Sequence, residues 1–329
     1  MIPQHIIRSV KNDKTLHLAI SGGVDSMALL YAMNDSIEDK NIVVHYVNHN
    51  VSKKSAIWGD FVGKEVESLD ADSKNQFVFI HHHVFFENHQ NFESQAREKR
   101  YSAIYSKMAD GEKLFLAHHS DDQVENVILN LFKGRGLSGL TSLRESNIVA
   151  RNIELVRPFL GTSKKDLADY VKSIGKTHIE DDSNTSCDYD RNFIRNKVIK
   201  LALERFKSLK PSILSTYNTL LSSKNALDEL IEMKLEDLTV EGDSLDSIKL
   251  SEFNKLSFSV RQEILIAIFR KNGFYTYSGK TIKEVVKQAE NVERNGRLTA
   301  NIDIKNKDSI FRIGFDKKDK VKILTFNCY

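Results

Sequence analysis

The sequence of 329 residues contains little cysteine and little proline, and it has no long apolar run. Its two cysteines, Cys187 and Cys328, lie far apart and lack the spacing of metal ligands, which argues against a structural zinc site and suits the reducing cytoplasm. No stretch of about 18 apolar residues occurs, so no membrane span is expected. The first residues, MIPQHIIRSVKNDK, lack the apolar core of a signal peptide. These absences favour a cytoplasmic protein.

The net charge is only +3, so any surface for nucleic acid has to be local. Seven Lys or Arg stand against one acid between residues 191 and 210, and seven bases against three acids between residues 305 and 322. Between residues 228 and 246, eight acids stand against one lysine. Each run alone is also explained by an ordinary solvated face. Their alternation along the chain favours segregated charge.

The first third of the chain alternates between strand and helix patterns. Near-continuous apolar runs predict strands at residues 15–20, 42–47, 76–84 and 113–118, and amphipathic stretches predict helices at 24–33, 56–69 and 91–109. This alternation predicts an α/β fold with a parallel, doubly wound sheet that is covered on both faces. Functional residues are then expected beyond the carboxyl ends of the strands.

A domain boundary is expected near residue 210, where Pro211 follows a basic helical pattern. Helical patterns follow at 212–238, 259–271 and 280–293, and strand patterns lie within 297–306 and 309–315. We therefore expect two domains: an α/β domain at 1–210, and at 211–329 a mainly helical domain with a small β tail.

The stretch LHLAISGGVDSMALLYAM (16–33) places Ser21-Gly22-Gly23 between a strand and a helix. Free N–H groups at a helix N-terminus, helped by the helix dipole, form an anion site that glycines let a phosphate approach closely. Ser21 and Ser26 add hydroxyl donors. Asp25 would repel a bare phosphate, so it suggests either a bridging Mg²⁺ or a structural role in the first turn. The alternative is an ordinary strand-to-helix turn that binds no ligand.

Two other glycine motifs lack the context that a nucleotide site requires. The stretch GFYTYSGKT (273–281) has one residue too many for a Walker A loop and follows a helix pattern. GRGLSG (134–139) fits G-x-G-x-x-G but also follows a helix pattern rather than a strand. We expect a flexible loop at 134–139.

A second cluster of polar residues lies in AHHSDDQVENVILNLF (117–132), at a predicted strand end. Ser120 and Gln123 have the spacing of a capping box. Asp122 and Glu125 then share one helix face, where two carboxylates could hold a substrate amine or a metal. The alternative is that acids merely favour the first turn of a helix. The histidine triplet 81–83 receives no function, because alternate strand side chains point to opposite faces.

Two arginine-rich segments complete the set of candidates. Helical spacing in 91–101 brings Glu93, Arg97 and Arg100 together, with Ala96 and Tyr101 turned elsewhere; a surface ion-pair helix is the alternative. Arg191 and Arg195 lie four apart on one predicted helix, where two guanidinium groups could grip phosphates or a base. An ordinary start to a basic helix explains them too.

Together these segments resemble the tRNA(Ile)-lysidine synthase family of the ATP-pyrophosphatase (PP-loop) superfamily. The shared motifs run in family order from about residue 15 to 200: SGG-x-DS at 21–26, VNH at Val47-Asn48-His49, N-x-E-x-x-A-R-x-x-R-Y at 91–101, AHH-x-DDQ-x-E at 117–125, the glycine-rich loop at 134–140, Arg157-Pro158, and Asp182-Ser183-Asn184 with Arg191 to Arg195. The chain departs from the family at Asn126, where ET is frequent, and at Asn50, where NHG is frequent.

The resemblance implies conversion of the wobble cytidine of an isoleucine tRNA with a CAU anticodon to lysidine, using ATP and free L-lysine. ATP would be held by residues of the first loop: Ser21, Gly22, Gly23, Val24, Asp25 and Ser26, with Mg²⁺ at Asp25. Asp122 and Glu125 would orient the lysine amine, and a carboxylate or His118 would take its proton. The flipped base, its phosphates or the adenylate would be handled by Arg97, Arg191 and Arg195.

The region 211–329 would grip the tRNA body through the bases of 305–322. Larger family members carry a further C-terminal domain, and this chain is expected to stop before it. The oligomeric state is not determined by the sequence, and a homodimer is one option. One alternative is a PP-loop tRNA sulfurtransferase, which the lack of a C-x-x-C pair disfavours. The other is a non-catalytic ATP- or RNA-binding module, which has no need of acids beside phosphates.

Overall fold

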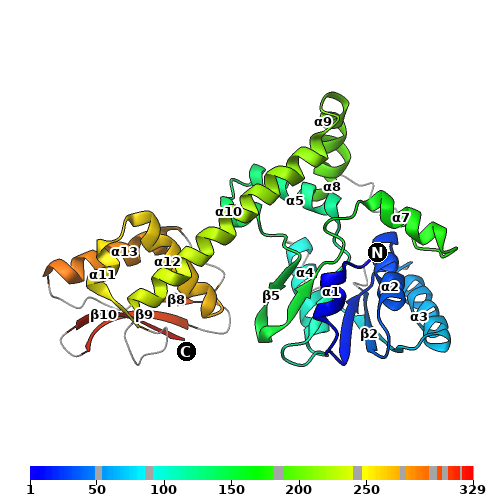
Figure 1. Cartoon of the computed structure of the whole chain (residues 1–329), viewed down its shortest axis with the longest axis horizontal. Helices are drawn as coiled ribbons and strands as arrows, with labels where there is room; N and C mark the ends of the chain where they lie inside the picture. The colour runs from blue at the N-terminus through cyan, green and yellow to red at the C-terminus, as the bar shows by residue number, and fades with distance from the viewer. Residues whose placement is uncertain are drawn as a thin grey trace. The chain divides into compact units, whose positions relative to one another are not determined.

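The computed structural model describes residues 1–48, 54–85, 92–180, 189–239, 247–274, 279–295, 302–305, 310–318 and 321–328. The chain divides into two compact units, Met1–Leu220 and Leu221–Tyr329, and the division falls inside the long helix α10 (Leu209–Leu238) (Figure 1). Pro211 lies in the first turn of α10, where its missing N–H removes no helical hydrogen bond. Among the helices in these ranges, none has the length and apolar character that crossing a membrane requires.

A six-stranded sheet with strand order β3-β2-β1-β4-β6-β5 forms the centre of the first unit. Its strands are β1 (Thr15–Ala19), β2 (Asn41–Asn48), β3 (Gln76–His83), β4 (Lys113–Phe115), β5 (Ser146–Ile148) and β6 (Glu154–Val156). All neighbouring pairs are parallel except β5 with β6, which is antiparallel at the edge. The predicted parallel sheet is confirmed, although its fourth strand is shorter than the run 113–118.

Helices cover both faces of this sheet, as a doubly wound fold requires. The core on one face joins the strands to α1 (Gln4–Ser9), α2 (Val24–Ser36), α3 (Lys54–Asp72) and α7 (Lys164–Ser173). Helix α2 is buried continuously from Ser26 to Met33, which explains its uniformly apolar sequence. On the other face, α4 (Phe92–Tyr105) contributes Ile104 to a core with β4 and β6.

The strand order reverses between β1 and β4. From β1 the chain moves outward to β2 and β3, and it then returns to β4 on the other side of β1. In open α/β sheets, ligands bind in the crevice beyond the carboxyl ends of the strands at such a reversal. The loops after β1 and β4 are therefore placed where a site is expected.

A helical layer follows the sheet. Helix α5 (Ser120–Phe132) packs against α8 (Asp190–Phe193), the π-helical turn η3 (Ile194–Val198) and α9 (Ile199–Arg205), which follow one another without a break. Val124, Ile194 and Ile199 form their shared core. The flexible loop predicted at 134–139 is wrong in part: Leu137–Leu140 forms the short helix α6, and Asn130 Nδ2 donates to the Gly139 carbonyl at 2.8 Å.

The second unit combines helices with a four-stranded antiparallel sheet of order β7-β10-β9-β8. Its strands are β7 (Ser247–Lys249), β8 (Ile302–Lys305), β9 (Ile310–Lys318) and β10 (Val321–Cys328), and its helices are α11 (Leu250–Lys255), α12 (Phe258–Lys271) and α13 (Gly279–Asn295). The buried side chains of Phe253, Phe269 and Leu324 belong to its core. The predicted helices and β tail are confirmed; β7 and β10 were not predicted.

Candidate active site

The loop after β1 is organised by hydrogen bonds between its own residues. Ser26 Oγ donates to the Gly23 carbonyl at 2.8 Å and accepts from the Ser21 amide at 3.2 Å, and the two serine hydroxyls are 3.2 Å apart. Gly23 is the N-cap of α2, and no side chain caps this N-terminus. The first-turn N–H groups therefore remain available to an anion. Ser26 shapes the loop, while the exposed Ser21 can donate outward.

Gly22 is the position where this loop requires glycine. Its φ is +87°, in the left-handed region, and an added Cβ would lie 2.5 Å from Ile179 Cδ1. The Ile179 amide also donates to the Gly22 carbonyl at 2.9 Å. The segment that follows α7 therefore packs against this loop at Gly22.

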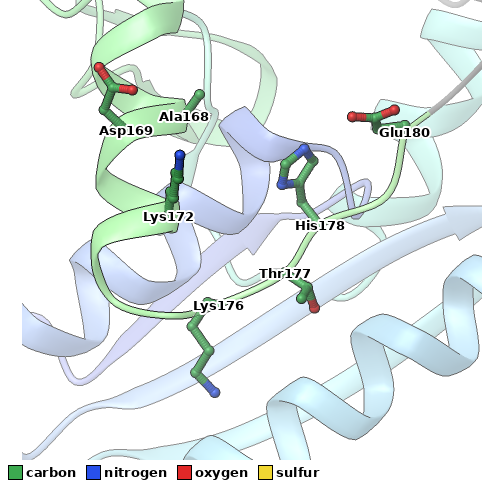
Figure 2. Close-up of a pocket in the computed structure, with 7 residues that line it drawn as sticks. All are labelled: Ala168, Asp169, Lys172, Lys176, Thr177, His178 and Glu180. Atoms are coloured by element: carbon green, nitrogen blue, oxygen red, sulfur yellow. The ribbon is translucent and has the colours of Figure 1, made fainter.

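A pocket of about 460 Å³ lies between α7 and this segment (Figure 2). Its lining combines both charge signs: Ala168, Asp169, Lys172, Lys176, Thr177, His178 and Glu180. In Figure 2 the side chains of Lys172 and Lys176 leave the backbone in opposite directions. Lys176 is held by Glu65 at 3.2 Å and lies over the Tyr31 ring at 5.4 Å. The residues predicted from the motifs do not line this pocket.

The start of α5 differs from the predicted capping box. The N-cap is His119 rather than Ser120, and the His119 amide donates to Asp122 Oδ2 at 3.0 Å. The Ser120 amide instead donates to the Thr162 carbonyl at 2.9 Å. The prediction of a box between Ser120 and Gln123 is thus wrong by one residue: the carboxylate that accepts from the N-cap amide is that of Asp122, three residues after His119.

His119 joins the two predicted clusters. Its Nε2 atom lies 3.5 Å from Asp25 Oδ2, in the first turn of α2, and 3.5 Å from Asp122 Oδ2, in the first turn of α5. Burial alone would lower the pKa of His119, but the hydrogen bond to Asp25 and the surrounding carboxylate charges raise it. Asp25 Oδ1 is buried and has no hydrogen-bond partner among the described residues. The carboxyl ends of β1 and β4 therefore share one acidic junction.

Asp122 and Glu125 share one helix face, as predicted, and both are paired with the predicted arginines. Arg191 bonds Asp122 Oδ1 at 2.8 Å and Glu125 Oε2 at 2.9 Å. Arg195 bonds the two oxygens of Glu125 at 2.6 and 2.8 Å. Glu125 is only 2% exposed and has both oxygens engaged. We call these four residues the carboxylate–arginine quartet; its charges balance, and it holds both guanidinium groups at the junction.

His118 lies in a positively charged environment. Burial and the charges of Arg157, Arg191 and Arg97 lower its pKa well below the usual value, so its imidazole is neutral at pH 7. Its Nδ1 atom is buried and has no hydrogen-bond partner in the part of the chain that the structure describes. Arg157, 3% exposed, donates to the Arg144 carbonyl at 2.8 Å and to Asn147 at 2.7 Å.

Arg97 is not bound to the acidic junction by any described ion pair. Its Cζ atom lies 5.1 Å from the centre of the Tyr101 ring, so the expectation that Tyr101 turns elsewhere is wrong. The i, i+4 spacing of the two residues puts them on one helix face. The side chain of Glu93 lies outside the described residues, as do His49 and the stretch 182–184.

Two lysines at the junction were missed by the sequence analysis. Lys210 pairs with Asp121, and the Lys164 amide donates to the same carboxylate at 2.9 Å. Burial would raise the pKa of Asp121, but these bonds hold it below the ordinary value. Lys164 Nζ also lies 4.0 Å from Asp25 Oδ2. No motif signal marked Lys164, whereas His119 belongs to the cluster expected at the end of the strand before α5.

Of the histidine triplet, His82 belongs to a different buried feature, a ladder across three strands. His17 Nδ1 lies 2.8 Å from His45 Nε2, and His45 Nδ1 lies 2.9 Å from His82 Nε2. The other nitrogen of His17 lies 2.9 Å from Glu112. We call Glu112, His17, His45 and His82 the histidine ladder. Burial lowers the pKa of all three histidines, and that of His45 to about 3.

Comparison with known proteins links this geometry to one domain family. The PP-loop domain family model matches residues 3–202. The tRNA(Ile)-lysidine synthase of Wigglesworthia glossinidia brevipalpis is 29% identical, over 97% of this chain and 81% of that protein. The protein of the same name from Legionella pneumophila (strain Paris) is 32% identical, over 86% of this chain. The chain spans only 64% of the length of that Legionella protein.

Among solved structures, the U34-tRNA thiolase NcsA from Methanococcus maripaludis is similar to this chain with a TM-score of 0.48 and 18% sequence identity. The match covers 66% of this chain and 77% of that chain.

Proposed function

Because the chain belongs to the PP-loop domain family, we propose that it uses ATP to attach free L-lysine to the wobble cytidine of an isoleucine tRNA with a CAU anticodon. The choice of substrate is supported by the relatives, which bear the name tRNA(Ile)-lysidine synthase. One observation supports the chemistry. Asp25, His119 and Asp122 meet where the strand order reverses between β1 and β4, beside the two arginines of the carboxylate–arginine quartet. The same proposal places the enzyme in the cytoplasm, with its tRNA.

In the first step, the C2 oxygen of cytosine attacks the α-phosphorus of ATP. The bond from that phosphorus to the bridging oxygen breaks, and pyrophosphate leaves. The uncapped N-terminus of α2 and the Ser21 hydroxyl would bind the phosphates. Arg191 and Arg195 would offer their remaining N–H donors to the charge that develops on phosphorus.

In the second step, the ε-amine of lysine attacks C2, the C2–O bond breaks and AMP leaves with the oxygen. The amine loses one proton as the new C–N bond forms. His118 is a suitable acceptor because its imidazole is neutral and no described residue forms a hydrogen bond with its Nδ1 atom. Asp122, positioned by His119, would orient the amine. Glu125 would act through the arginines, since both its oxygens are engaged.

Mg²⁺ fits this site through Asp25. Mg²⁺ is usually held by one or two carboxylates together with substrate phosphates, and no described residue forms a hydrogen bond with the buried Asp25 Oδ1. Over the described ranges, no group of three or more His, Cys, Asp or Glu side chains is arranged to hold a metal by itself. When bound, the ion would neutralise phosphate charge. Asp25 would hold it, and His119 would keep the carboxylate in place.

Incorporation of labelled lysine into CAU-anticodon tRNA(Ile) tests the proposal. Wild-type protein should label the tRNA only with ATP, and Asp25→Ala and Asp122→Ala should each lower the rate about a hundredfold or more. Asp72→Ala, on the exposed side of α3, is the matched control and should label normally. Undiminished labelling in both site variants would contradict the assignment.

Pyrophosphate exchange separates the remaining alternatives. Exchange of labelled pyrophosphate into ATP that depends on tRNA but not on lysine supports the adenylation step. Nucleotide binding without exchange would instead indicate a non-catalytic module. Transfer of sulfur to the tRNA, with no lysine label, would indicate a sulfurtransferase.

A further inference from the structure

The basic run 191–210 is divided between two uses. Three of its seven bases are bound by carboxylates of the site: Arg191, Arg195 and Lys210. The other four are Lys197, Lys200, Arg205 and Lys207, and all are exposed. None of these four has an ion-pair partner among the residues that the structure describes. They therefore present unneutralised positive charge to solvent.

Exposed aromatic side chains accompany this charge. Phe132 at the end of α5 is 64% exposed, and Tyr189 and Phe193 at the start of α8 are 43% and 49% exposed. Lys133 Nζ pairs with Asp190 Oδ2 at 3.0 Å, which ties the end of α5 to the start of α8. Each of the three aromatic residues thus lies within three positions of a member of this ion pair along the chain. We define the aromatic–basic face as Phe132, Tyr189, Phe193, Lys197, Lys200 and Arg205.

The continuous helical path from α8 to α9 explains why ring and charge fall on one side. Ile194 and Ile199 point into the core with α5, and Arg191 and Arg195 reach the quartet. The positions left over, Phe193 and Lys197, are four apart and form an exposed ridge. Figure 1 shows α5, α8 and α9 next to one another in the first unit.

This combination matches the chemistry of unpaired nucleotides. Single-stranded nucleic acids bind to proteins through bases stacked on aromatic rings and phosphates placed beside Lys or Arg. An apolar protein partner would leave the free cations without partners, at a cost in desolvation. The face also continues from the candidate active site, because Glu125 and Phe132 are seven residues apart on α5, or about 10 Å at 1.5 Å per residue.

Resting on the proposed function, we infer that the aromatic–basic face binds the unpaired anticodon-loop nucleotides that flank the modified cytidine. The rings stack on neighbouring bases, and the exposed lysines and Arg205 contact their phosphates. Specific recognition of RNA commonly targets such splayed loop bases. The face holds the loop while the flanked cytosine reaches the junction of Asp25, His119 and Asp122.

Two pairs of substitutions test the inference, with a fluorescent CAU anticodon stem-loop RNA as the probe. Phe132→Ala with Phe193→Ala should weaken binding at least tenfold, because each stacked base contributes about five- to a hundredfold. Lys200→Glu with Arg205→Glu should weaken binding comparably and flatten the plot of log affinity against log salt by about 0.7 per lost phosphate contact. The aromatic pair should leave that slope unchanged, a difference that general unfolding would not produce.

Steady-state kinetics provide the second readout. Both double variants should raise the KM for tRNA and leave the KM for ATP unchanged. Ile57→Ala and Lys64→Glu, exposed positions on α3, are the matched apolar and charge controls, and both should bind RNA as the wild type does.

The outcomes separate the inference from the proposed function. A wild-type protein that neither binds nor labels tRNA contradicts the proposed function. A wild-type protein that labels tRNA, with double variants that bind the stem-loop equally well, overturns the inference alone. Sedimentation tests whether a second copy of this chain covers the face instead. If the wild type is a dimer, and Phe132→Ala with Phe193→Ala converts it to a monomer without changing its affinity for RNA, the face serves self-association and the inference is overturned too.

Discussion

Removing the central member of the histidine ladder should change how stability depends on pH. His45 is 1% exposed, and burial lowers its pKa from the ordinary 6.5 to about 3, with the neighbouring His17 and His82 adding to the effect. The charged groups that face the ladder are Glu112, beside His17, and Lys107, whose charge lowers the pKa of His82. Folded protein therefore keeps His45 neutral where the unfolded chain takes up a proton.

The sign follows from this difference in proton uptake. The stability linked to His45 is fully present above pH 6.5 and is lost as the pH falls from 6.5 toward 3, because only the unfolded state binds the extra proton in that range. Between about pH 7.5 and pH 4.5 the loss of stability amounts to about 3 kcal/mol, because the pH passes through about two units below 6.5 and each costs about 1.36 kcal/mol. His45→Leu should therefore lose less free energy of unfolding over this pH range than the wild type does, by that amount.

At neutral pH the same substitution should be destabilising. The Glu112 carboxylate can only accept, so neutral His17 donates from Nε2 and accepts at Nδ1, and each later histidine follows the same tautomer. His45→Leu leaves the acceptor of His17 and the donor of His82 without partners, at about 1–3 kcal/mol for each buried group. The variant should thus be less stable than the wild type at pH 7.5, with a gap that narrows at pH 4.5.

Urea unfolding followed by tryptophan fluorescence measures this directly. Trp58 is the only tryptophan and packs against the core of the first unit, so its signal reports on the unit that contains the ladder. His5→Leu, at an exposed histidine, is the matched control and should reproduce the wild-type pH profile. Equal losses of stability in wild type and His45→Leu between pH 7.5 and 4.5 would refute the reasoning.

Three further predictions concern the site. Gly22→Ala should raise the KM for ATP at least tenfold, measured by steady-state kinetics, and lower the free energy of unfolding by about 1 kcal/mol or more, measured in urea. The reason is that it combines a left-handed φ with a Cβ 2.5 Å from Ile179 Cδ1. Glu125→Gln should lower the free energy of unfolding by about 2 kcal/mol, since two half-buried guanidinium groups lose their charged acceptor. In Asp25→Asn, NMR titration should show a lower pKa for His119, because a bond that raises it is lost while burial stays.

Hydrophobic periodicity was sufficient for the long elements and failed for the short ones. The apolar runs of β1 and β2 and the amphipathic pattern of α12 extend far enough for their period to be read. Strands β5 and β6 have only three residues each, so no period can be counted in them. They are held by pairing with each other and with β4, which is tertiary information.

The motifs found the members of the site but not their pairings. Asp122, Glu125, Arg191 and Arg195 were each expected to touch substrate, and the structure shows them neutralising one another. Their partners are nearly seventy positions apart in the chain, beyond any local pattern. The ladder escaped for the same reason: a triplet on one strand says nothing about His17 and His45 on two others.

This mutual pairing has a consequence for the order of events at the site. A lysine ammonium that entered the quartet would have to displace a guanidinium from Asp122, whereas a phosphate can bind the arginines through N–H groups that the carboxylates leave unused. Glu125, nearly fully buried with both oxygens engaged, stays bound in either case. An anionic nucleotide that draws Arg191 toward itself would release Asp122 for an amine.

ATP should therefore bind to the free enzyme without lysine, and lysine should bind tightly only after ATP. A calorimetric titration that shows equal lysine affinity with and without a non-hydrolysable ATP analogue would rule out this coupling.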